Sequence, residues 1–313
     1  IAALGVYTGF TMGVSSLDAW FPLIAGAAVF LLSWLPHGLV GLISLIPIGV
    51  YAWFTVPELD GLRLFFAVLF LAGGLLLILG SLYRRKSSAM FFPLAVTTVL
   101  ALAGLSVSTG LLQFFFAWEL MTVASYFMVL LGKSSEKPAL LYLGFSLGGA
   151  FSVMAGLAVL APSLPTVPTE RLADLSTALI ETLGPQTAVL AFGLLAAGFL
   201  VKSAAAGVHI WLPGTYAEAD DETTPILSAL VSKAGIFGLM LFTLILAGAL
   251  GIGEAAGHSA TGGGGDSLTS GGGGLASGIF AASGLLSSGA AAALFAALRC
   301  IGALTALFGA LFA

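Results

Sequence analysis

The stretch that decides the fold class is LLQFFFAWELMTVASYFMVLL at residues 111–131, in which Glu119 is the single charged residue. Its 21 residues match the length of about 20 predominantly apolar residues that a helix needs to cross the hydrocarbon core of a bilayer. A helix satisfies its own backbone hydrogen bonds, so it is a form in which such a stretch can cross lipid. The sequence therefore predicts a membrane-spanning helix with a carboxyl group inside it.

The same apolar pattern repeats along most of the chain. Of the 313 residues, 59% are hydrophobic and 8% are charged, and the mean hydropathy is +1.12. A soluble domain carries about 25% charged residues, so water is not the solvent for most of this surface. We therefore expect an all-α, polytopic transmembrane helix bundle of about 10–11 spans. The expected spans are 21–36, 37–56, 62–83, 91–109, 111–132, 138–161, 186–211 and 225–250, with further ones at 1–16, 275–296 and 300–313.

Composition also limits the partners and the compartment. The net charge of −4 comes without a basic block or interleaved basic and aromatic residues, so no nucleic-acid partner is expected. Cys300 is the only cysteine and reads as an inert buried thiol. No basic segment precedes the first apolar stretch, so we expect no cleavable signal peptide. The spans themselves predict a multi-pass protein of the cell (inner) membrane.

Charges at the span ends and shifts in composition suggest an orientation and four regions. Cations at 84–86 follow the span 62–83, and the cations at 133 and 137 follow the span 111–132, which is two spans later. Both loops are therefore expected on the same, cytoplasmic side. Pro36-His37 predicts either a tight hairpin or a kinked single span. Residues 251–274 are rich in Gly and Ser and read as a flexible linker. The expected regions are N-terminal membrane helices at 1–60, a helix bundle at 61–250, the linker, and Ala/Leu-rich membrane segments of unassigned function at 275–313.

Three ionisable residues lie well inside apolar stretches, namely Glu119, Lys202 and Lys233. A charge at the centre of a membrane helix costs about 2.5–3.5 kcal/mol on insertion scales, which favours a functional interpretation. The alternative is an inert ion pair that ties helices together. One acid and two lysines on separate spans can exchange charge states, because burial favours the neutral form of a lysine and a nearby carboxylate favours the charged form.

Between the two lysines, the sequence HIWLPG at 209–214 predicts a broken helix. Pro213 removes a backbone donor and Gly214 relaxes the chain, and a break at membrane depth is tolerated only beside protein or water. A hydrated cavity or an interfacial helix end would both explain the pattern. His209 is a candidate proton relay near neutral pH, and the alternative is a hydrogen-bonded interfacial histidine.

An acidic run follows the predicted break. Its carboxylates could concentrate cations at an ion entrance, whereas the alternative is a solvated loop. The residues of the run are Glu218, Asp220, Asp221 and Glu222.

Three of these stretches resemble one family. FFFAWELMT at 114–122, VKSAAAGVHIWLPGTYAEA at 201–219 and SALVSKAGIFGL at 228–239 are similar to segments of antiporter-like, proton-translocating membrane subunits. These subunits occur in respiratory complex I, membrane-bound hydrogenases and Mrp-type cation/proton antiporters. The similarity runs from about residue 21 to residue 250 of the chain. Residues 61–250 would then form the antiporter-like bundle.

The resemblance assigns roles to the buried charges. It implies that Glu119 and Lys202 form an ion pair, that Lys233 continues a polar axis, and that His209 matches the histidine of the family's H-x-W-L-P turn. The function implied is proton translocation within a multi-subunit complex, either a proton-pumping oxidoreductase or a cation/proton antiporter. The alternatives are a Na⁺ or K⁺/H⁺ antiporter module and a non-conducting scaffold.

The resemblance also sets expectations for cofactors and partners. It implies no catalytic site and no metal, flavin or quinone in this subunit. The expected partners are other integral membrane subunits, the lipid bilayer, and protons with Na⁺ or K⁺. The family has two inverted repeats, each with its own broken helix. Residues 251–313 contain no second W-L-P turn, so the exit half of a proton path is unassigned.

Overall fold

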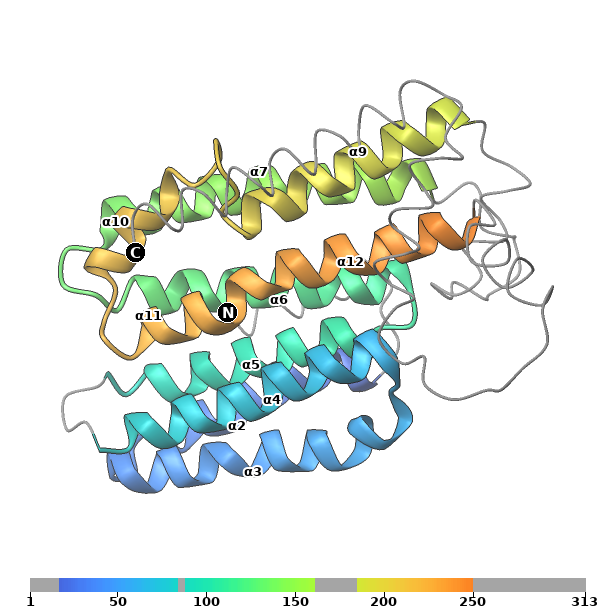
Figure 1. Cartoon of the computed structure of the whole chain (residues 1–313). Helices are drawn as coiled ribbons and strands as arrows, with labels where there is room; N and C mark the ends of the chain where they lie inside the picture. Colours follow the sequence, from blue (N-terminus) through green and yellow to red (C-terminus); the bar gives the residue numbers. More distant parts are fainter. Residues whose placement is uncertain (1–16, 84–87, 161–184, 250–313) are drawn as a thin grey trace, which may run out of the picture.

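The computed structural model describes residues 17–83, 88–160 and 185–249. Within these ranges the chain is helical without strands, which confirms the expected all-α, polytopic bundle (Figure 1). The spans expected at 1–16, 275–296 and 300–313, the linker at 251–274 and the cations at 84–86 lie outside the described residues. The count of 10–11 spans and the four regions therefore stay predictions.

Long apolar helices follow each other through the described part of the chain. Five helical stretches in these ranges are long and apolar enough to cross a membrane, and three more apolar helices are shorter. The helices are α2 (Leu17–Leu31), α3 (His37–Thr55), α4 (Gly61–Ser81), α5 (Phe91–Val107), α6 (Leu111–Val129), α7 (Glu136–Leu160), α9 (Pro185–Lys202), α10 (Trp211–Glu218), α11 (Thr223–Ile226) and α12 (Ser232–Ala249). A 3₁₀ turn at Val56–Glu58 extends α3, and a π-helical turn at Leu227–Val231 joins α11 to α12.

The segment at Pro36-His37 forms a turn between two separate helices. Helix α2 ends at Leu31 and α3 begins at His37, directly after the proline. The carbonyl oxygen of Pro36 accepts hydrogen bonds from the first free amides of α3, at 2.8 Å from Leu39 and 3.1 Å from Val40. Of the two arrangements that the sequence allowed, the structure therefore has the hairpin.

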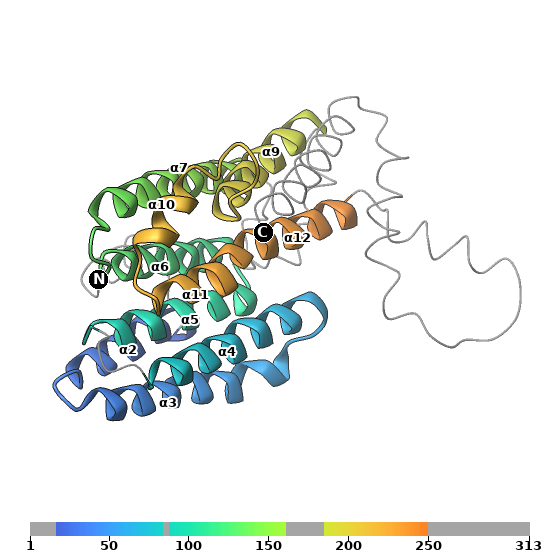
Figure 2. The ribbon, with the colours of Figure 1, turned by 60° about the vertical axis from the view of Figure 1, so that its left-hand side comes forward.

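Helix α5 is the centre of one half of the bundle. Every residue from Phe91 to Ser106 is buried, because α2, α3, α4 and α6 pack around it (Figure 2). Small residues bring neighbouring backbones close, as is typical where helices associate in lipid. A methyl group at Gly26 would overlap the Thr97 side chain, and one at Gly74 would overlap Val99. Helices α2–α5 contribute a largely apolar frame, in which Arg63 of α4 donates to the carbonyl oxygens of Ser106 and Ser108 at the end of α5.

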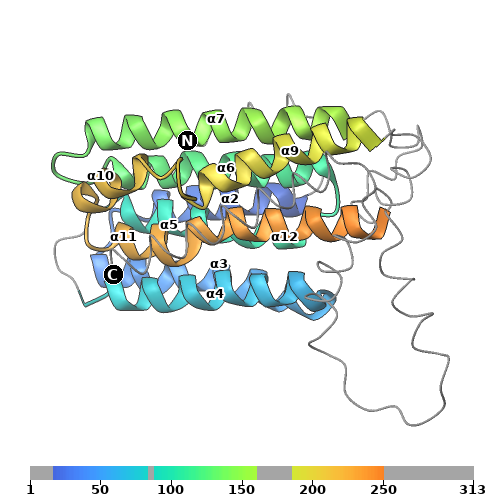
Figure 3. The ribbon, with the colours of Figure 1, turned by 45° about the horizontal axis from the view of Figure 1, so that its top comes forward.

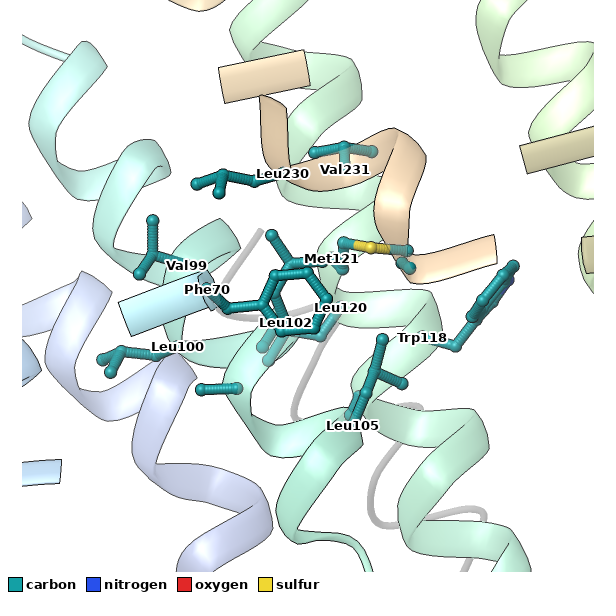
Figure 4. Close-up of a cluster of buried hydrophobic side chains, with 14 of the residues drawn as sticks. Phe70, Val99, Leu100, Leu102, Leu105, Trp118, Leu120, Met121, Leu230 and Val231 are labelled. Carbon is teal, nitrogen blue, oxygen red and sulfur yellow. The ribbon is translucent and has the colours of Figure 1, made fainter. Parts of the chain in front are cut away.

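An apolar cluster connects this frame to the π-helical turn (Figure 4). Phe70 of α4 and Val99 of α5 lie on one side of it, and Leu230 and Val231 of the π-helical turn lie on the other. All four side chains are at most 1% exposed. The frame therefore fixes the segment that leads into Lys233.

The other half of the bundle consists of α7, α9 and α10, with α6 and α12 between the two halves (Figure 3). Helices α7 and α9 run side by side and approach closely at two glycines. A methyl group at Gly198 would overlap the carbonyl oxygen of Gly149 and the side chain of Val153. Hydroxyl-bearing and charged side chains gather between α6, α7 and α9, which places the candidate site there.

Candidate functional site

Lys202 is the last residue of α9, and the chain turns sharply after it. The amide of Ala204 donates to the carbonyl oxygen of Val201 at 3.2 Å, and the amide of Ala205 donates to that of Leu200 at 3.0 Å. Ala204 has a φ of 53°, the left-handed conformation that closes a Schellman cap. Lys202 therefore lies at the end of α9 that carries partial negative charge.

The predicted helix break is confirmed, and the structure locates it at residues 203–210. The expected span 186–211 therefore ends nine residues early. Trp211, Pro213 and Gly214 belong to α10 rather than to the break, because the first turn of a helix needs no donor from proline. The indole Nε1 of Trp211 donates to the carbonyl oxygen of Val201 at 3.1 Å, which connects the two sides of the break.

The ammonium group of Lys202 lies in a ring of three hydroxyl groups. Its Nζ donates to Tyr142 OH at 2.8 Å, Thr122 Oγ1 at 3.1 Å and Ser146 Oγ at 3.4 Å. The side chain is 2% exposed, and Nζ lies 4.8 Å from the centroid of the Tyr142 ring. An ammonium has three hydrogens, so the ring supplies one acceptor for each. The face of the tyrosine ring stabilises the positive charge further.

These hydroxyl groups were not predicted from the sequence, although their spacing along α6 and α7 is a weak signal. Tyr142 and Ser146 lie four residues apart on α7 and therefore on one face of an otherwise apolar helix. Thr122 and Ser125 are similarly placed on α6. Ser125 Oγ lies 2.6 Å from Tyr142 OH and 3.0 Å from the carbonyl oxygen of Thr122, to which it donates.

Glu119 lies on α6, one turn before Thr122, and is partly buried. Its carboxyl group interacts electrostatically with Lys202. In the described part of the chain, the hydrogen-bond partners of Lys202 Nζ are hydroxyl groups. The direct ion pair that the resemblance implies stays a prediction.

Lys233 is partly buried near the start of α12, and its partner is the backbone. Its Nζ donates to the carbonyl oxygen of Ser228 at 2.9 Å. Ser228 belongs to the π-helical turn, a local widening that is frequent at functional sites. The hydroxyl of Ser232 donates to the preceding carbonyl, that of Leu227, at 3.0 Å. The consecutive carbonyl groups of Leu227 and Ser228 therefore accept hydrogen bonds from the consecutive side chains of Ser232 and Lys233.

His209 lies within the break and is partly buried. Its Nδ1 accepts a hydrogen bond from the amide of Gly207 at 3.3 Å. Gly207 has a φ of 96°, a conformation that glycine adopts without strain. This contact shapes the loop, and the relay role of His209 stays a prediction.

The acidic run begins at Glu218, the last residue of α10, and continues through the turn to α11. A methyl group at Gly132 would overlap the carbonyl oxygen of Glu218, so this turn packs directly on the turn between α6 and α7. Burial, followed by the neighbouring Asp221, raises the pKa of Asp220, while Lys133 acts in the opposite direction. The remaining member, Glu222, is partly buried next to α11.

The acidic run thus lies at the same end of the bundle as Lys133, on the expected cytoplasmic side. Its role as an ion entrance stays a prediction. Among the described residues, no three His, Cys, Asp or Glu side chains gather in an arrangement that could hold a metal ion.

The fold and the buried lysines define a polytopic helical membrane protein with ionisable groups inside the bundle. Residues 108–255 match the family model described as NADH:quinone oxidoreductase/Mrp antiporter, TM. Over this segment the chain is similar to the antiporter-like membrane subunits of that family, which confirms the resemblance drawn from the motifs.

One relative has a similar sequence, and two solved structures have a similar fold. The NADH-quinone oxidoreductase subunit N of Trichlorobacter lovleyi is 28% identical over 229 residues, which are 69% of this chain and 46% of that protein. The fold is similar to that of a chain of the membrane-bound sulfane sulfur reductase, an archaeal respiratory membrane complex. The TM-score is 0.62 and the sequence identity is 23%, and the match covers 75% of this chain and 42% of that one. A chain of the Mrp complex from Dietzia sp. DQ12-45-1b gives a TM-score of 0.59, 19% identity and coverage of 79% and 29%. The chain spans less than half the length of each of these three proteins.

Proposed function

We propose that the chain translocates protons across a membrane, as an antiporter-like subunit of a multi-subunit complex, by changes of charge along Glu119, Lys202 and Lys233. The observation that carries this proposal is the ring of three hydroxyl groups around the buried ammonium of Lys202. The relatives that occur in membrane complexes support the presence of partner subunits.

A ring of hydroxyl groups suits a lysine that gains and loses a proton. The charged amine donates three hydrogen bonds, and each hydroxyl accepts one. The neutral amine donates two and accepts one, which requires only that one hydroxyl turns its hydrogen toward the nitrogen. A carboxylate in the same place would stabilise the charged form alone. The ring therefore satisfies both charge states with little rearrangement.

Glu119 supplies the control over this lysine. A carboxylate near Lys202 stabilises the ammonium, and weakening their interaction favours release of the proton. Each tenfold change in the protonation equilibrium corresponds to about 1.4 kcal/mol, so a small displacement of α6 relative to α9 is sufficient. In this mechanism Lys233 receives the proton on the next helix.

The proposal is tested by measuring proton translocation in vesicles that contain the assembled complex. Lys202→Met removes the carrier, and Lys202→Arg keeps a charge that is not released at accessible pH. Both variants, and Glu119→Gln, should assemble in normal amounts and lose translocation. Lys133→Met, at an exposed lysine, is the matched control and should translocate normally. Wild-type translocation by assembled Lys202→Met would overturn the proposal.

The same vesicles separate the alternatives. A cation antiporter dissipates a pH gradient faster when Na⁺ or K⁺ is added, whereas a proton path does not depend on these ions. A scaffold would keep complex assembly and all transport when Glu119, Lys202 and Lys233 are replaced together by apolar residues, because losing buried charges is neutral or stabilising.

A further inference from the structure

A second pair of hydroxyl groups joins α10 to the start of α12, next to Lys233. Tyr216 of α10 places its OH 3.1 Å from Ser232 Oγ, and Ser232 directly precedes Lys233. Tyr216 is partly buried and interacts electrostatically with Tyr142, the closest partner of Lys202. Tyr216 therefore brings a hydroxyl group from α10, on the far side of the break, to the start of α12.

We propose that Tyr216 and Ser232 form the relay that passes protons between the hydroxyl ring of Lys202 and Lys233. This inference rests on the proposed function and assigns to α10 a direct part in it. The alternative is that the Tyr216–Ser232 contact only fastens α10 to α12.

The first step takes place at the hydroxyl ring. An N–H bond of the Lys202 ammonium breaks as an O–H bond forms on Tyr142, and the original phenolic proton of Tyr142 leaves toward Tyr216 through a water molecule. No phenolate forms, because each phenol gains one proton as it releases another. Ser125 sets the direction, since it lies within 3.0 Å of both Tyr142 OH and the carbonyl oxygen of Thr122. Ser125 has one hydroxyl hydrogen, which it donates to the carbonyl oxygen of Thr122; when this hydrogen turns to Tyr142 instead, the phenolic hydrogen of Tyr142 is free to point toward Tyr216.

The second step takes place at the π-helical turn. Ser232 donates to the carbonyl oxygen of Leu227, so its oxygen is available to accept from Tyr216. A proton that arrives on Ser232 displaces the serine's own hydroxyl proton. That proton passes, directly or through a second water molecule, to the neutral amine of Lys233, which lies at the adjacent carbonyl of Ser228. The neutral lysine gains the proton that Lys202 loses, so the charge balances.

The test uses conservative variants of the assembled complex. Tyr216→Phe and Ser232→Ala remove one hydroxyl group each, and both should lower proton translocation at least about tenfold at unchanged assembly. Ser232→Thr keeps a hydroxyl and should retain translocation. The double variant should be no slower than either single variant, because both remove the same path. The matched control is Thr243→Val, which removes a hydroxyl group from the same helix, α12, outside the relay; the Thr243 hydroxyl donates to the Leu239 carbonyl.

A solvent isotope measurement separates a relay from a fastening role. Wild-type translocation should slow in D₂O, and the residual translocation of Tyr216→Phe should have a different isotope effect. If Tyr216→Phe translocates at the wild-type rate, or Ser232→Thr fails as Ser232→Ala does, the relay is wrong. Loss of translocation only in proportion to lost assembly would show the fastening role instead.

If Lys202→Met abolishes translocation but Tyr216→Phe does not, the relay alone fails. If Lys202→Met translocates normally, the proposed function itself fails.

Discussion

The two buried lysines occupy opposite kinds of surroundings in one bundle. Lys202 is 2% exposed, ends a helix, and binds hydroxyl side chains from two other helices. Lys233 is partly buried, lies within the continuous helical stretch that begins at Thr223, and binds a backbone carbonyl of that stretch. A membrane protein can therefore hold a cation either by breaking a helix and gathering side chains, or by widening one turn of an unbroken helix.

This difference determines how each site responds to mutation. The surroundings of Lys202 are made of side chains that can be replaced one at a time. Those of Lys233 are made of backbone, so replacing the neighbouring side chain leaves the contact intact. The two sites also meet at Gly235, which lies two residues after Lys233 on α12 and packs against the end of α9, where Lys202 lies.

The largest effect is expected at Gly235, where α12 touches the end of α9. A methyl group there would overlap the carbonyl oxygen of Phe199 and come 2.8 Å from the amide nitrogen of Ser203. Gly235→Ala should lower the unfolding free energy by up to about 3 kcal/mol, as overpacking typically does, and should reduce translocation because both lysines are displaced. Detergent unfolding measures the stability. Gly193→Ala on α9, with no atom within 4 Å, should cost nothing. Equal stability of the two variants would contradict the close contact.

Thr122→Val should have the next largest effect. It keeps the shape of the side chain but leaves one hydrogen of the Lys202 ammonium without its acceptor, which costs about 1–2 kcal/mol. The corresponding change beside the other lysine, Ser228→Ala, should stay within about 0.5 kcal/mol, because Lys233 contacts the Ser228 backbone. The unfolding free energy of both variants is measured under the same conditions. A loss at Ser228 as large as that at Thr122 would remove the contrast between the two sites.

Ala204→Gly should act in the opposite direction. Alanine at a φ of 53° is strained by its Cβ, and glycine relieves most of that strain, so the variant should be more stable by about 0.5–1 kcal/mol. Ala206→Gly, two residues later and without a positive φ, should instead be slightly less stable. Thermal unfolding of the two variants distinguishes them. If both lose stability, the turn after Lys202 does not depend on the left-handed conformation.

The smallest effect is expected at Asp220, in the turn between α10 and α11, which gives a comparison with a partly exposed charge at the end of the bundle. Its pKa is raised from an ordinary value of 3.8, so the folded chain holds the proton more tightly than the unfolded chain. That contribution to stability is complete below pH 3.8 and is lost as the pH rises through the raised pKa. Because the group is partly exposed, the loss should stay below about 0.5 kcal/mol.

Unfolding measured at several pH values should therefore show a small decrease for the wild type that Asp220→Asn lacks. Asp221→Asn removes one of the causes of the shift and should give an intermediate slope. Identical slopes for all three proteins would show that burial of Asp220 has no energetic consequence.

The sequence predicted the helical bundle and the burial of Lys202 for the same reason. A lone charge among apolar residues is conspicuous, so Lys202 and Lys233 stood out. Their partners did not, because a tyrosine or a serine inside an apolar helix is ordinary. The four-residue spacing of Tyr142 and Ser146 defines a face of α7, but no pattern in the sequence states that this face meets the end of α9.

The position of the break was predicted to within a few residues, and the error has a physical cause. Pro213 suggested that the helix stops at the W-L-P turn, yet proline is accepted in the first turn of a helix, and α10 begins just before it. The actual stop depends on the Schellman cap at Ala204. That cap is hard to read from sequence, because alanine is elsewhere the best helix former.

The complete burial of α5 has a consequence for how the protein is assembled in the membrane. This helix enters lipid with acyl chains on every side and exchanges them all for α2, α3, α4 and α6. Lipid tails are as apolar as leucine, so this exchange gains its free energy from close contact between helices, such as the approach of Gly26 to Thr97. A chain synthesised only as far as α4 contains α2, α3 and α4, which pack around α5, but not α5 itself. Helices α2–α4 therefore reach their native packing only after α5 has been inserted.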